Sequence, residues 1–249
     1  VPREKELKFF CSESLLEQNG GSGTKRAFAN IVRSEAEYIS HYDGVGASDF
    51  IGEVTPHYLY YHREAIPRIK GLLGDPRIVI VLRNPVDRAY SQYMHLARDG
   101  RETKSFSEVL DMEDSNIQSG LEFAWHFKAV GMYHQQVKAY LDNFTNVDVY
   151  VYEDWKADLT ALASRIYNSM GGSEVLKSDS KHRNVGGVPR SKFLHRIITG
   201  RELRWIAGFK AKYFNFLPSL GLLAAARQKN LVREELGQEL RGRLNKYFY

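Results

Sequence analysis

The sequence predicts an α/β domain with a mostly parallel central sheet flanked by helices. Two apolar, β-branched runs, residues 78–82 and 147–152, are typical of strands, and a helix-forming segment follows each of them. Strands that alternate with helices favour a parallel sheet, because the helix returns the chain to the end of the sheet where the first strand began. The 249 residues are enough for one such domain with a sizeable core.

Composition limits the kinds of ligand and compartment that we expect. The net charge of +5 favours anionic ligands such as nucleotides or acidic glycans, and no block of Lys and Arg predicts a nucleic-acid partner. Cys11 is the only cysteine, so neither an intrachain disulfide nor a thiolate metal site is expected, and a reducing, cytoplasmic compartment is favoured. No apolar run approaches the length of a membrane span.

The first quarter of the chain contains mainly helix and turn signals. The glycine-rich run 20–26 has no strand before it and lacks the spacing of a phosphate loop, so we predict a flexible surface loop there. Ser34 and Glu37 form a capping box that predicts a short helix through Tyr42. Residues 49–54 predict a short strand, and Thr55-Pro56 then predicts a helix start.

The stretch from Ile78 to Ser91 carries the clearest chemical signal. Ile78–Leu82 predicts a strand buried on both faces, and Asn84-Pro85 predicts the cap and first residue of a helix. Arg83 therefore stands at the carboxyl end of a strand, where open α/β sheets bind ligands. Ser91 lies about two turns into the helix, on the face of Asp87 and Arg88. Two interpretations stay open: a clamp for a phosphate or sulfate group, or a surface Arg83–Asp87 pair beside an ordinary serine.

The second half continues the alternation of elements. A capping box at Ser105 and Glu108 predicts a helix, and an aromatic stripe over residues 131–144 predicts a helix that packs in the core. Residues 113–127 have no clear periodicity and are interpreted either as part of an acceptor pocket or as a surface excursion. A helix is expected over 157–170, and residues 193–249 are expected to be helical.

Three segments resemble one family. Arg83-Asn-Pro-x-x-Arg-x-x-Ser91-x-Tyr93 resembles the 3′-phosphate-binding motif of sulfotransferases that use 3′-phosphoadenosine 5′-phosphosulfate. Lys5-Glu-Leu-Lys-Phe-Phe10 and Gly52-Glu-Val-Thr-Pro-His-Tyr58 resemble two further segments of that family. Two later stretches also resemble segments of that family: the strand 147–152 with Glu153-Asp154 and the helix after it, and a late basic loop, residues 181–191. The resemblance therefore covers nearly the whole chain, and it is closest to the bacterial branch related to carbohydrate, heparan-type, sulfotransferases. It implies a P-loop-like three-layer fold.

The resemblance also implies a domain organisation. We expect residues 1–249 to form a single sulfotransferase domain, of which 193–249 is a helical extension. In the family, a strand and a phosphate loop that bind the 5′-phosphosulfate come just before the Lys-Glu-x-x-Phe-Phe segment. The sequence is therefore expected to be truncated at both ends, with that loop and the extreme carboxyl end missing.

The implied reaction is in-line transfer of a sulfuryl group to a hydroxyl or amine of a glycan or other small molecule, with no metal. Glu6 is the expected base, and Glu53 is either a second candidate base or a structural group that holds Thr55. The residues expected to bind the nucleotide are Arg83, Ser91, Arg183, Gly187, Arg190 and Ser191. Those expected on the acceptor side are Lys5, Lys8, Thr55, His57 and Tyr58.

Two departures from the family weaken a heparan-type acceptor. Lys8 stands where glycosaminoglycan-modifying relatives often have His, and Val54 stands where they often have Lys. Two other functions stay open, a non-catalytic nucleotide-binding domain and a P-loop small-molecule kinase, although the kinase would need a Walker-type loop and magnesium-binding carboxylates. A bacterial protein of this kind is expected in the cytoplasm, and a eukaryotic one in the Golgi lumen.

Overall fold

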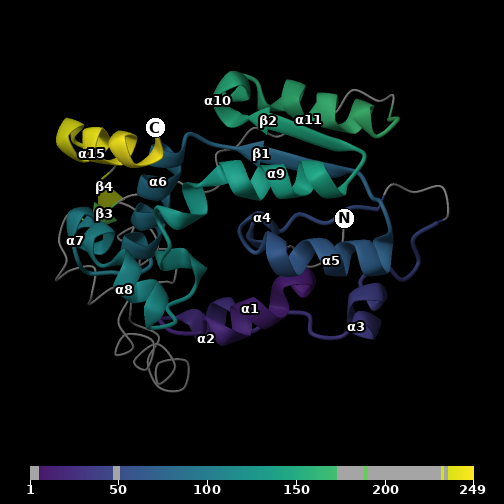
Figure 1. Cartoon of the computed structure of the whole chain (residues 1–249), viewed down its shortest axis with the longest axis horizontal. Coiled ribbons are helices and arrows are strands. Elements are labelled where there is room, and N and C mark those ends of the chain that lie inside the picture. Colours follow the sequence, from purple (N-terminus) through teal and green to yellow (C-terminus); the bar gives the residue numbers. More distant parts are fainter. Residues whose placement is uncertain (1–5, 47–50, 173–187, 190–230, 233–234) are drawn as a thin grey trace, which may run out of the picture.

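A parallel pair of strands lies between two layers of helices. The computed structural model describes residues 6–46, 51–172, 188–189, 231–232 and 235–249. Strand β1 (Ile78–Leu82) pairs with β2 (Val147–Val151), and Ile78 lies opposite Val147. Helices α10 (Tyr152–Trp155) and α11 (Leu159–Ser169) lie on one side of the pair, and α9 (Tyr133–Asn143) and α5 (His62–Leu73) on the other (Figure 1). The predicted three-layer α/β fold is confirmed.

Strand β1 is less buried than the sequence predicts. Its bounds are those expected, but only Ile80 is buried, and Val81 is 48% exposed. The prediction of burial on both faces is wrong, because the described chain buries Ile80 on one face of β1 but leaves Val81, on the other face, about half exposed. The apolar run thus predicted the bounds of the strand correctly, but it did not predict how much of the strand is exposed.

The core under the sheet includes the amino-terminal segment. Residues 7–10 pass beneath β1, and η1 (Phe9–Cys11) packs on α5. The buried side chains of this cluster are Leu7, Phe9, Phe10, Val32, Tyr38, Ala65, Ile66, Ile69, Ile80, Tyr140 and Phe144. The aromatic stripe predicted on α9 therefore packs in the core through Tyr140 and Phe144, whereas Leu141 faces solvent.

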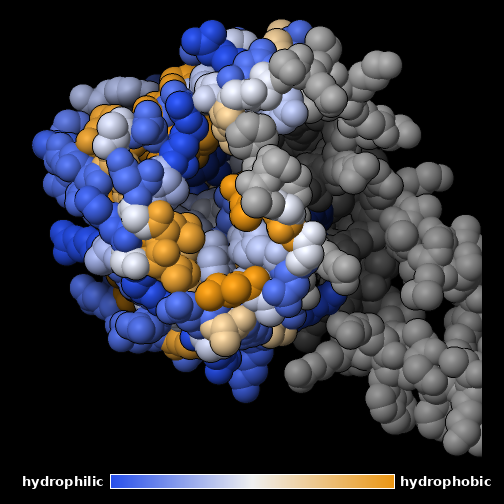
Figure 2. Space-filling model, turned by 90° about the vertical axis from the view of Figure 1, so that its right-hand side faces the viewer, coloured by the Kyte–Doolittle hydropathy of each residue, from blue (hydrophilic) through white to orange (hydrophobic). Residues whose placement is uncertain are grey.

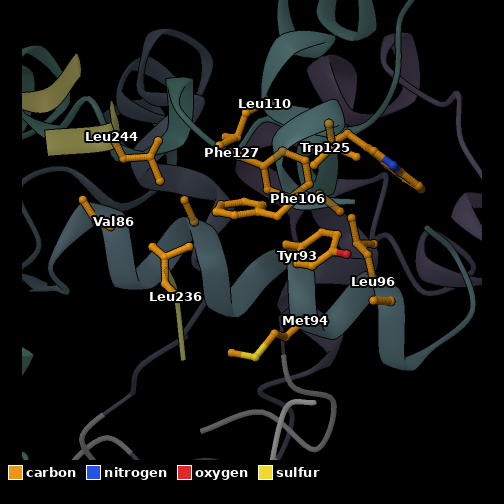
Figure 3. Close-up of a cluster of buried hydrophobic side chains, with 14 residues drawn as sticks. Val86, Tyr93, Met94, Leu96, Phe106, Leu110, Trp125, Phe127, Leu236 and Leu244 are labelled. Atoms are coloured by element: carbon orange, nitrogen blue, oxygen red, sulfur yellow. The ribbon is translucent and has the colours of Figure 1, made fainter. Parts of the chain in front are cut away.

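A second core surrounds α6 (Pro85–Arg98). This helix buries one face against α7 (Phe106–Asp111) and against Trp125 and Phe127 (Figure 3). Leu236 and Leu244 complete the same cluster, and Leu244 belongs to α15 (Gln238–Phe248). The last helix of the described chain thus packs on the helix that follows β1.

The predicted helix starts are largely confirmed. Asn84 Oδ1 accepts hydrogen bonds from the amides of Val86 (3.0 Å) and Asp87 (3.2 Å), and Ser105 and Glu108 form a complete capping box. Ser34 caps α3 (Glu35–Ser40), which ends before the predicted Tyr42. Helix α11 begins at Leu159, slightly later than predicted.

The glycine-rich run 20–26 is not a free surface loop. The chain forms α1 (Ser12–Glu17) before it and α2 (Thr24–Ala27) at its end. Gly20 makes a parallel bridge with Leu121, and a Cβ on Gly21 would lie 2.5 Å from the Trp125 ring. The prediction of a flexible loop is wrong because these glycines allow close approach to the 121–125 segment rather than chain freedom.

Three further expectations need correction. Residues 51–54 form no strand, and the side chains of Ile51 and Val54 are 59% and 57% exposed. Exposed apolar side chains also occur elsewhere on the surface, and Figure 2 shows one face of the molecule on which several are visible. Helix α4 (His57–Tyr60) breaks before α5 begins at His62. Residues 231–232 form strand β4, which pairs antiparallel with β3 (Val188–Pro189), so this part of the expected helical extension is wrong.

Residues 113–127 form part of the interior. They fold as α8 (Glu113–Gln118) and η2 (Phe123–Trp125), and the side chains of Glu113 and His126 are buried. The interpretation as a surface excursion is therefore wrong. Within the ranges that the structure describes, no helix has the length and apolar character of a membrane span.

Close packing at Gly21 yields a prediction about stability. Gly21→Ala should lower the free energy of unfolding by about 2–4 kcal/mol, because the methyl group overlaps Trp125 and the residue has a φ of +110°. Gly44→Ala is the matched control, since Gly44 has a φ of +82° but no atom within 4 Å of an added Cβ. The control should lose only about 1 kcal/mol. Equal losses in urea unfolding would contradict the packing argument.

Candidate functional site

Arg83 begins the turn between β1 and α6. The amide of the next residue, Asn84, donates to Glu153 Oε1 at 3.0 Å, and Glu153 lies just after β2. The Arg83 guanidinium carbon is 5.8 Å from the centre of the Tyr152 ring. The carboxyl ends of the two parallel strands are thus joined, and Arg83 lies at that edge, where α/β sheets bind ligands.

Arg83 is not paired with Asp87. The carboxylate of Asp87 instead accepts a hydrogen bond from Arg241 of α15 at 2.7 Å. The Nε atom of Arg83 is buried and finds no hydrogen-bond partner in the described part of the chain. The interpretation of Arg83 and Asp87 as a surface ion pair is therefore wrong, and a buried donor of this kind suits an oxyanion ligand.

Ser91 is half-buried on α6, two turns beyond Arg83. Arg88, which the spacing places on the same face, has a different function. Its guanidinium donates to the main-chain oxygens of His126 and Phe127, and burial lowers its pKa. Arg88 therefore fastens α6 to the 126–127 segment, which leaves Arg83 and Ser91 as the two donors of the predicted clamp.

Glu113 holds the neighbouring residues Lys128 and Ala129 in place. Its buried carboxylate accepts the amides of Lys128 (2.8 Å) and Ala129 (2.8 Å). Burial raises the pKa of Glu113, while these hydrogen bonds and the nearby positive charges oppose that rise. A buried carboxylate that accepts main-chain amides fixes the path of the chain, so residues 126–129 form a rigid support for α6.

Tyr133 lies beside Arg83, and no sequence pattern predicted this. Burial raises the pKa of the Tyr133 phenol, while the charge of Arg88 and the nearby main chain of Arg83 oppose that rise. As the first residue of α9, Tyr133 looked like one more member of the aromatic core stripe. Only the tertiary contact separates it from Tyr140.

The late basic loop reaches the same helix. Its described residues, Val188 and Pro189, form β3, which contacts α6. The nucleotide-binding residues predicted in this loop, which are Arg183, Gly187, Arg190 and Ser191, lie outside the described residues. Val188 and Pro189 thus lie near the helix that carries Ser91.

The segment with Glu6 has an unusual backbone. Glu6 and Lys8 have φ angles of 65° and 59°, a left-handed conformation that non-glycine residues seldom adopt. Leu7 between them is fully buried, and its carbonyl oxygen accepts the amide of Val32 at 3.1 Å. The buried Leu7 holds its two neighbours in this conformation, and strain of this type is common at functional sites. Lys5 lies outside the described residues.

Glu53 lies at the centre of a hydroxyl network. Its Oε1 atom accepts hydrogen bonds from Thr55 Oγ1 (2.6 Å) and the Tyr58 phenol (2.7 Å). Its Oε2 atom is buried and has no partner within the described ranges. The Tyr58 oxygen also accepts the Phe10 amide at 3.4 Å, which joins this network to the Lys5–Phe10 segment. Burial, followed by the charge of Glu53, raises the pKa of Tyr58.

The helix predicted to start after Thr55-Pro56 begins at His57, as expected, but no side chain caps it. The Thr55 hydroxyl donates to Glu53 instead of capping α4. The His57 ring packs on Phe123 with 4.5 Å between ring centres, and its pKa falls to about 3 because of burial and the charge of Lys8. His57 is therefore neutral at ordinary pH and is not a proton donor there. The Lys8 ammonium donates to the Ala27 carbonyl at 3.2 Å.

Other reactive groups are few in the described ranges. The Cys11 thiol is buried, and burial raises its pKa, so it is a poor nucleophile. No group of three or more His, Cys, Asp or Glu side chains that could hold a metal ion occurs in those ranges. The predicted site residues that the structure describes include two candidate oxyanion donors, Arg83 and Ser91, and two candidate bases, Glu6 and Glu53.

The fold is that of an α/β protein, and the candidate oxyanion site lies at the carboxyl edge of its sheet. A profile described as "Sulfotransferase family" matches residues 16–173, so the chain belongs to the sulfotransferase family. The structure is similar to that of a sulfotransferase from Alicyclobacillus acidocaldarius, with 32% sequence identity and a TM-score of 0.67. That similarity covers 91% of this chain and 87% of the other.

Curated relatives match over shorter segments. The chain is 33% identical over 66 residues to "Membrane-associated sulfotransferase kil1" of Dictyostelium discoideum, which is 26% of this chain and 14% of that protein. It is 30% identical over 93 residues to "Heparan sulfate glucosamine 3-O-sulfotransferase 3B1" of Mus musculus, which is 37% of this chain and 23% of that protein. The chain thus spans less than a quarter of the length of these relatives.

The lowered pKa of His57 predicts a pH dependence of stability. An ordinary histidine has a pKa of about 6.5 when unfolded, and His57 has a pKa of about 3 in the folded protein. The unfolded chain therefore binds the extra proton below pH 6.5, and stability falls as the pH decreases. Between pH 7 and pH 5 this group should account for a loss of about 2 kcal/mol.

Urea unfolding at the two pH values tests this expectation. His57→Gln should be less stable at pH 7, yet it should lose about 2 kcal/mol less than the unsubstituted protein on going to pH 5. His134→Gln, at an exposed position of α9, serves as the control and should retain the original pH dependence. An unchanged pH dependence in His57→Gln would contradict the assignment.

Proposed function

We propose that the protein transfers a sulfuryl group from 3′-phosphoadenosine 5′-phosphosulfate to a hydroxyl or amine of an acceptor. The observation that carries this proposal is the state of Arg83. This residue lies at the carboxyl end of β1 with a buried Nε that lacks a partner in the described chain, and Asp87 is engaged elsewhere. Membership of the sulfotransferase family supports the same reaction.

In this proposal, Arg83 and Ser91 bind the 3′-phosphate of the nucleotide. A guanidinium at a strand end and a hydroxyl two turns along the next helix offer donors from two directions to one phosphate group. The turn that carries the arginine is held in place, since the amide of Asn84 donates to Glu153 and the Asn84 side chain caps α6. The proposed contribution of the late loop, through Arg183, Gly187, Arg190 and Ser191, adds further cations and main-chain donors.

We assign the base to Glu6 in preference to Glu53. One oxygen of Glu53 already accepts two hydroxyl hydrogen bonds, and its other oxygen is buried, so this carboxylate holds Thr55 and Tyr58 and is less accessible to an acceptor. Glu6 is half-exposed, and the turn around Leu7 fixes its backbone. A carboxylate that is held in place yet still accessible suits proton abstraction from an acceptor.

The proposed reaction is a single in-line displacement. The acceptor oxygen or nitrogen attacks sulfur, and the bond between sulfur and the phosphate oxygen breaks. Glu6 takes the acceptor proton, and adenosine 3′,5′-bisphosphate leaves with the electron pair. Positioning and neutralisation of charge supply most of the rate in transfers of this type.

The acceptor is proposed to be a glycan or another small molecule. The mouse relatives are named for heparan sulfate, but the present chain has Lys8 and Val54 at two positions of its acceptor segments. The exposed Val54 and the aromatic pair of His57 and Phe123 favour an acceptor with some apolar surface over a uniformly acidic chain. The cytoplasmic location predicted from composition remains a prediction.

Loss of the Arg83 guanidinium should weaken nucleotide binding. Arg83→Ala should reduce the affinity for adenosine 3′,5′-bisphosphate by about 10- to 100-fold, because one charge-assisted contact to a phosphate is lost. Isothermal titration calorimetry measures this, with Arg63→Ala as the control at an exposed arginine of α5. An unchanged affinity in Arg83→Ala would remove the basis of the proposed site.

Replacement of the two carboxylates should separate their functions. Glu6→Gln should retain nucleotide affinity and lose about 10²- to 10⁴-fold in turnover, because an amide of the same shape cannot accept the proton. Glu53→Gln should retain more turnover. The assay is transfer of radiolabelled sulfate to a panel of glycan and phenolic acceptors. Near-normal turnover in Glu6→Gln, with turnover lost in Glu53→Gln, would move the base to Glu53.

A non-catalytic nucleotide-binding domain gives a different pattern. It would bind the nucleotide through Arg83 and transfer sulfate to no acceptor of the panel, in the unsubstituted protein as well as in the variants. Binding of ATP in preference to the bisphosphate would instead favour a kinase, since the 3′-phosphate is what the Arg83 site is proposed to recognise.

A further inference from the structure

We infer that Arg241 of the last helix tunes nucleotide binding by neutralising Asp87 beside the proposed 3′-phosphate site. This inference rests on the proposed function, because it assigns a role toward the nucleotide bound at Arg83 and Ser91. It concerns a residue that is 154 positions from Asp87 in the sequence. It also gives α15 a part in nucleotide binding beyond its part in the core.

The ion pair is held in place by apolar packing around it. Helix α15 contacts α6, and Leu244 packs in the same cluster as Val86 at the start of α6 (Figure 3). Near the end of α15, Phe248 packs against Gly131, which also lies against Pro85. These contacts bring Arg241 to the first turn of α6, where its guanidinium meets Asp87 at 2.7 Å.

Asp87 occupies a position where a free carboxylate would oppose anion binding. It is the third residue of α6, and Ser91 follows it by four positions, so their side chains are neighbours on the helix surface. A carboxylate in the first turn also offsets the partial positive charge at the amino-terminal end of the helix, and that charge would otherwise stabilise a bound phosphate. Without another partner, Asp87 would repel the phosphate and compete with it for Arg83.

Arg241 removes both of these effects. Its guanidinium forms an ion pair with the Asp87 carboxylate. The buried Nε of Arg83 therefore has no partner among the described residues and can donate to a ligand. The side chains of Arg241 and Asp87 are 42% and 36% exposed, so the pair itself adds little to folding stability. Its larger effect is on the electrostatic potential at the anion site, and this effect weakens as salt screens it.

The test is a double-substitution cycle on nucleotide affinity. Calorimetry with adenosine 3′,5′-bisphosphate compares the unsubstituted protein with Arg241→Gln, Asp87→Asn and the two combined. Arg241→Gln should weaken binding by about 3- to 10-fold at low salt, the size of an exposed charge acting at several ångströms. Adding Asp87→Asn should restore the affinity, and about 0.5 M salt should reduce the difference.

Two further variants separate charge from structure. Arg243→Gln is the matched control, because Arg243 lies on the same helix and pairs with Asp111 of α7, away from the first turn of α6. Its affinity should equal that of the unsubstituted protein. Arg241→Lys keeps the charge and should bind the nucleotide nearly as well as the unsubstituted protein.

The outcomes are distinct. Arg241→Gln with unchanged affinity, or a double variant that binds as weakly as Arg241→Gln alone, would overturn the inference, since the second result is that of a structural defect. An equal loss in Arg243→Gln would overturn it too. Failure of the unsubstituted protein to bind the nucleotide would overturn the proposed function itself, and the inference with it.

Discussion

The site depends on one hydrogen bond between main chain and side chain, from the Asn84 amide to Glu153. This bond joins the carboxyl ends of β1 and β2 just where β1 gives way to α6. The Asn84 side chain then caps α6 with its own oxygen. Because both contacts involve the residue after Arg83, the backbone from which that arginine projects is held by the sheet and by the helix together.

Buried charge elsewhere in the fold serves to support this edge. Arg88 donates to main-chain oxygens of the 126–127 segment, and Glu113 accepts main-chain amides two residues farther on. The hydrogen bonds that hold each of these charged groups come from peptide groups rather than from a partner of opposite charge, which fixes the path of the chain without neutralising the charge. In the Glu6–Lys8 segment the buried Leu7 also fixes the chain, since it lies between two residues in left-handed conformations that non-glycine residues seldom adopt.

Local rules explain which predictions were confirmed. Asn84-Pro85 and the Ser105 capping box start helices as predicted, because a cap needs only residues within one turn. Predictions that concerned the surroundings of a segment were wrong more often. The glycines at 20–23 suggested chain freedom, whereas Trp125, a hundred residues later, packs against them. Residues 51–54 looked like a strand, but a strand needs a neighbour, and the described chain provides none there.

The sequence by itself determined the strand, turn and helix around Arg83 and Ser91, because hydrophobic period, cap and proline act over a few residues. It also determined the family, through the spacing of those residues. Tertiary structure alone decided which partners these charged groups have. Asp87 is paired with Arg241, Arg88 donates to main-chain oxygens, and one oxygen of Glu53 accepts hydrogen bonds from two hydroxyl groups. The physical reason is that a charged side chain pairs with whatever the fold brings within about 3 Å, and spacing along the chain does not fix that distance.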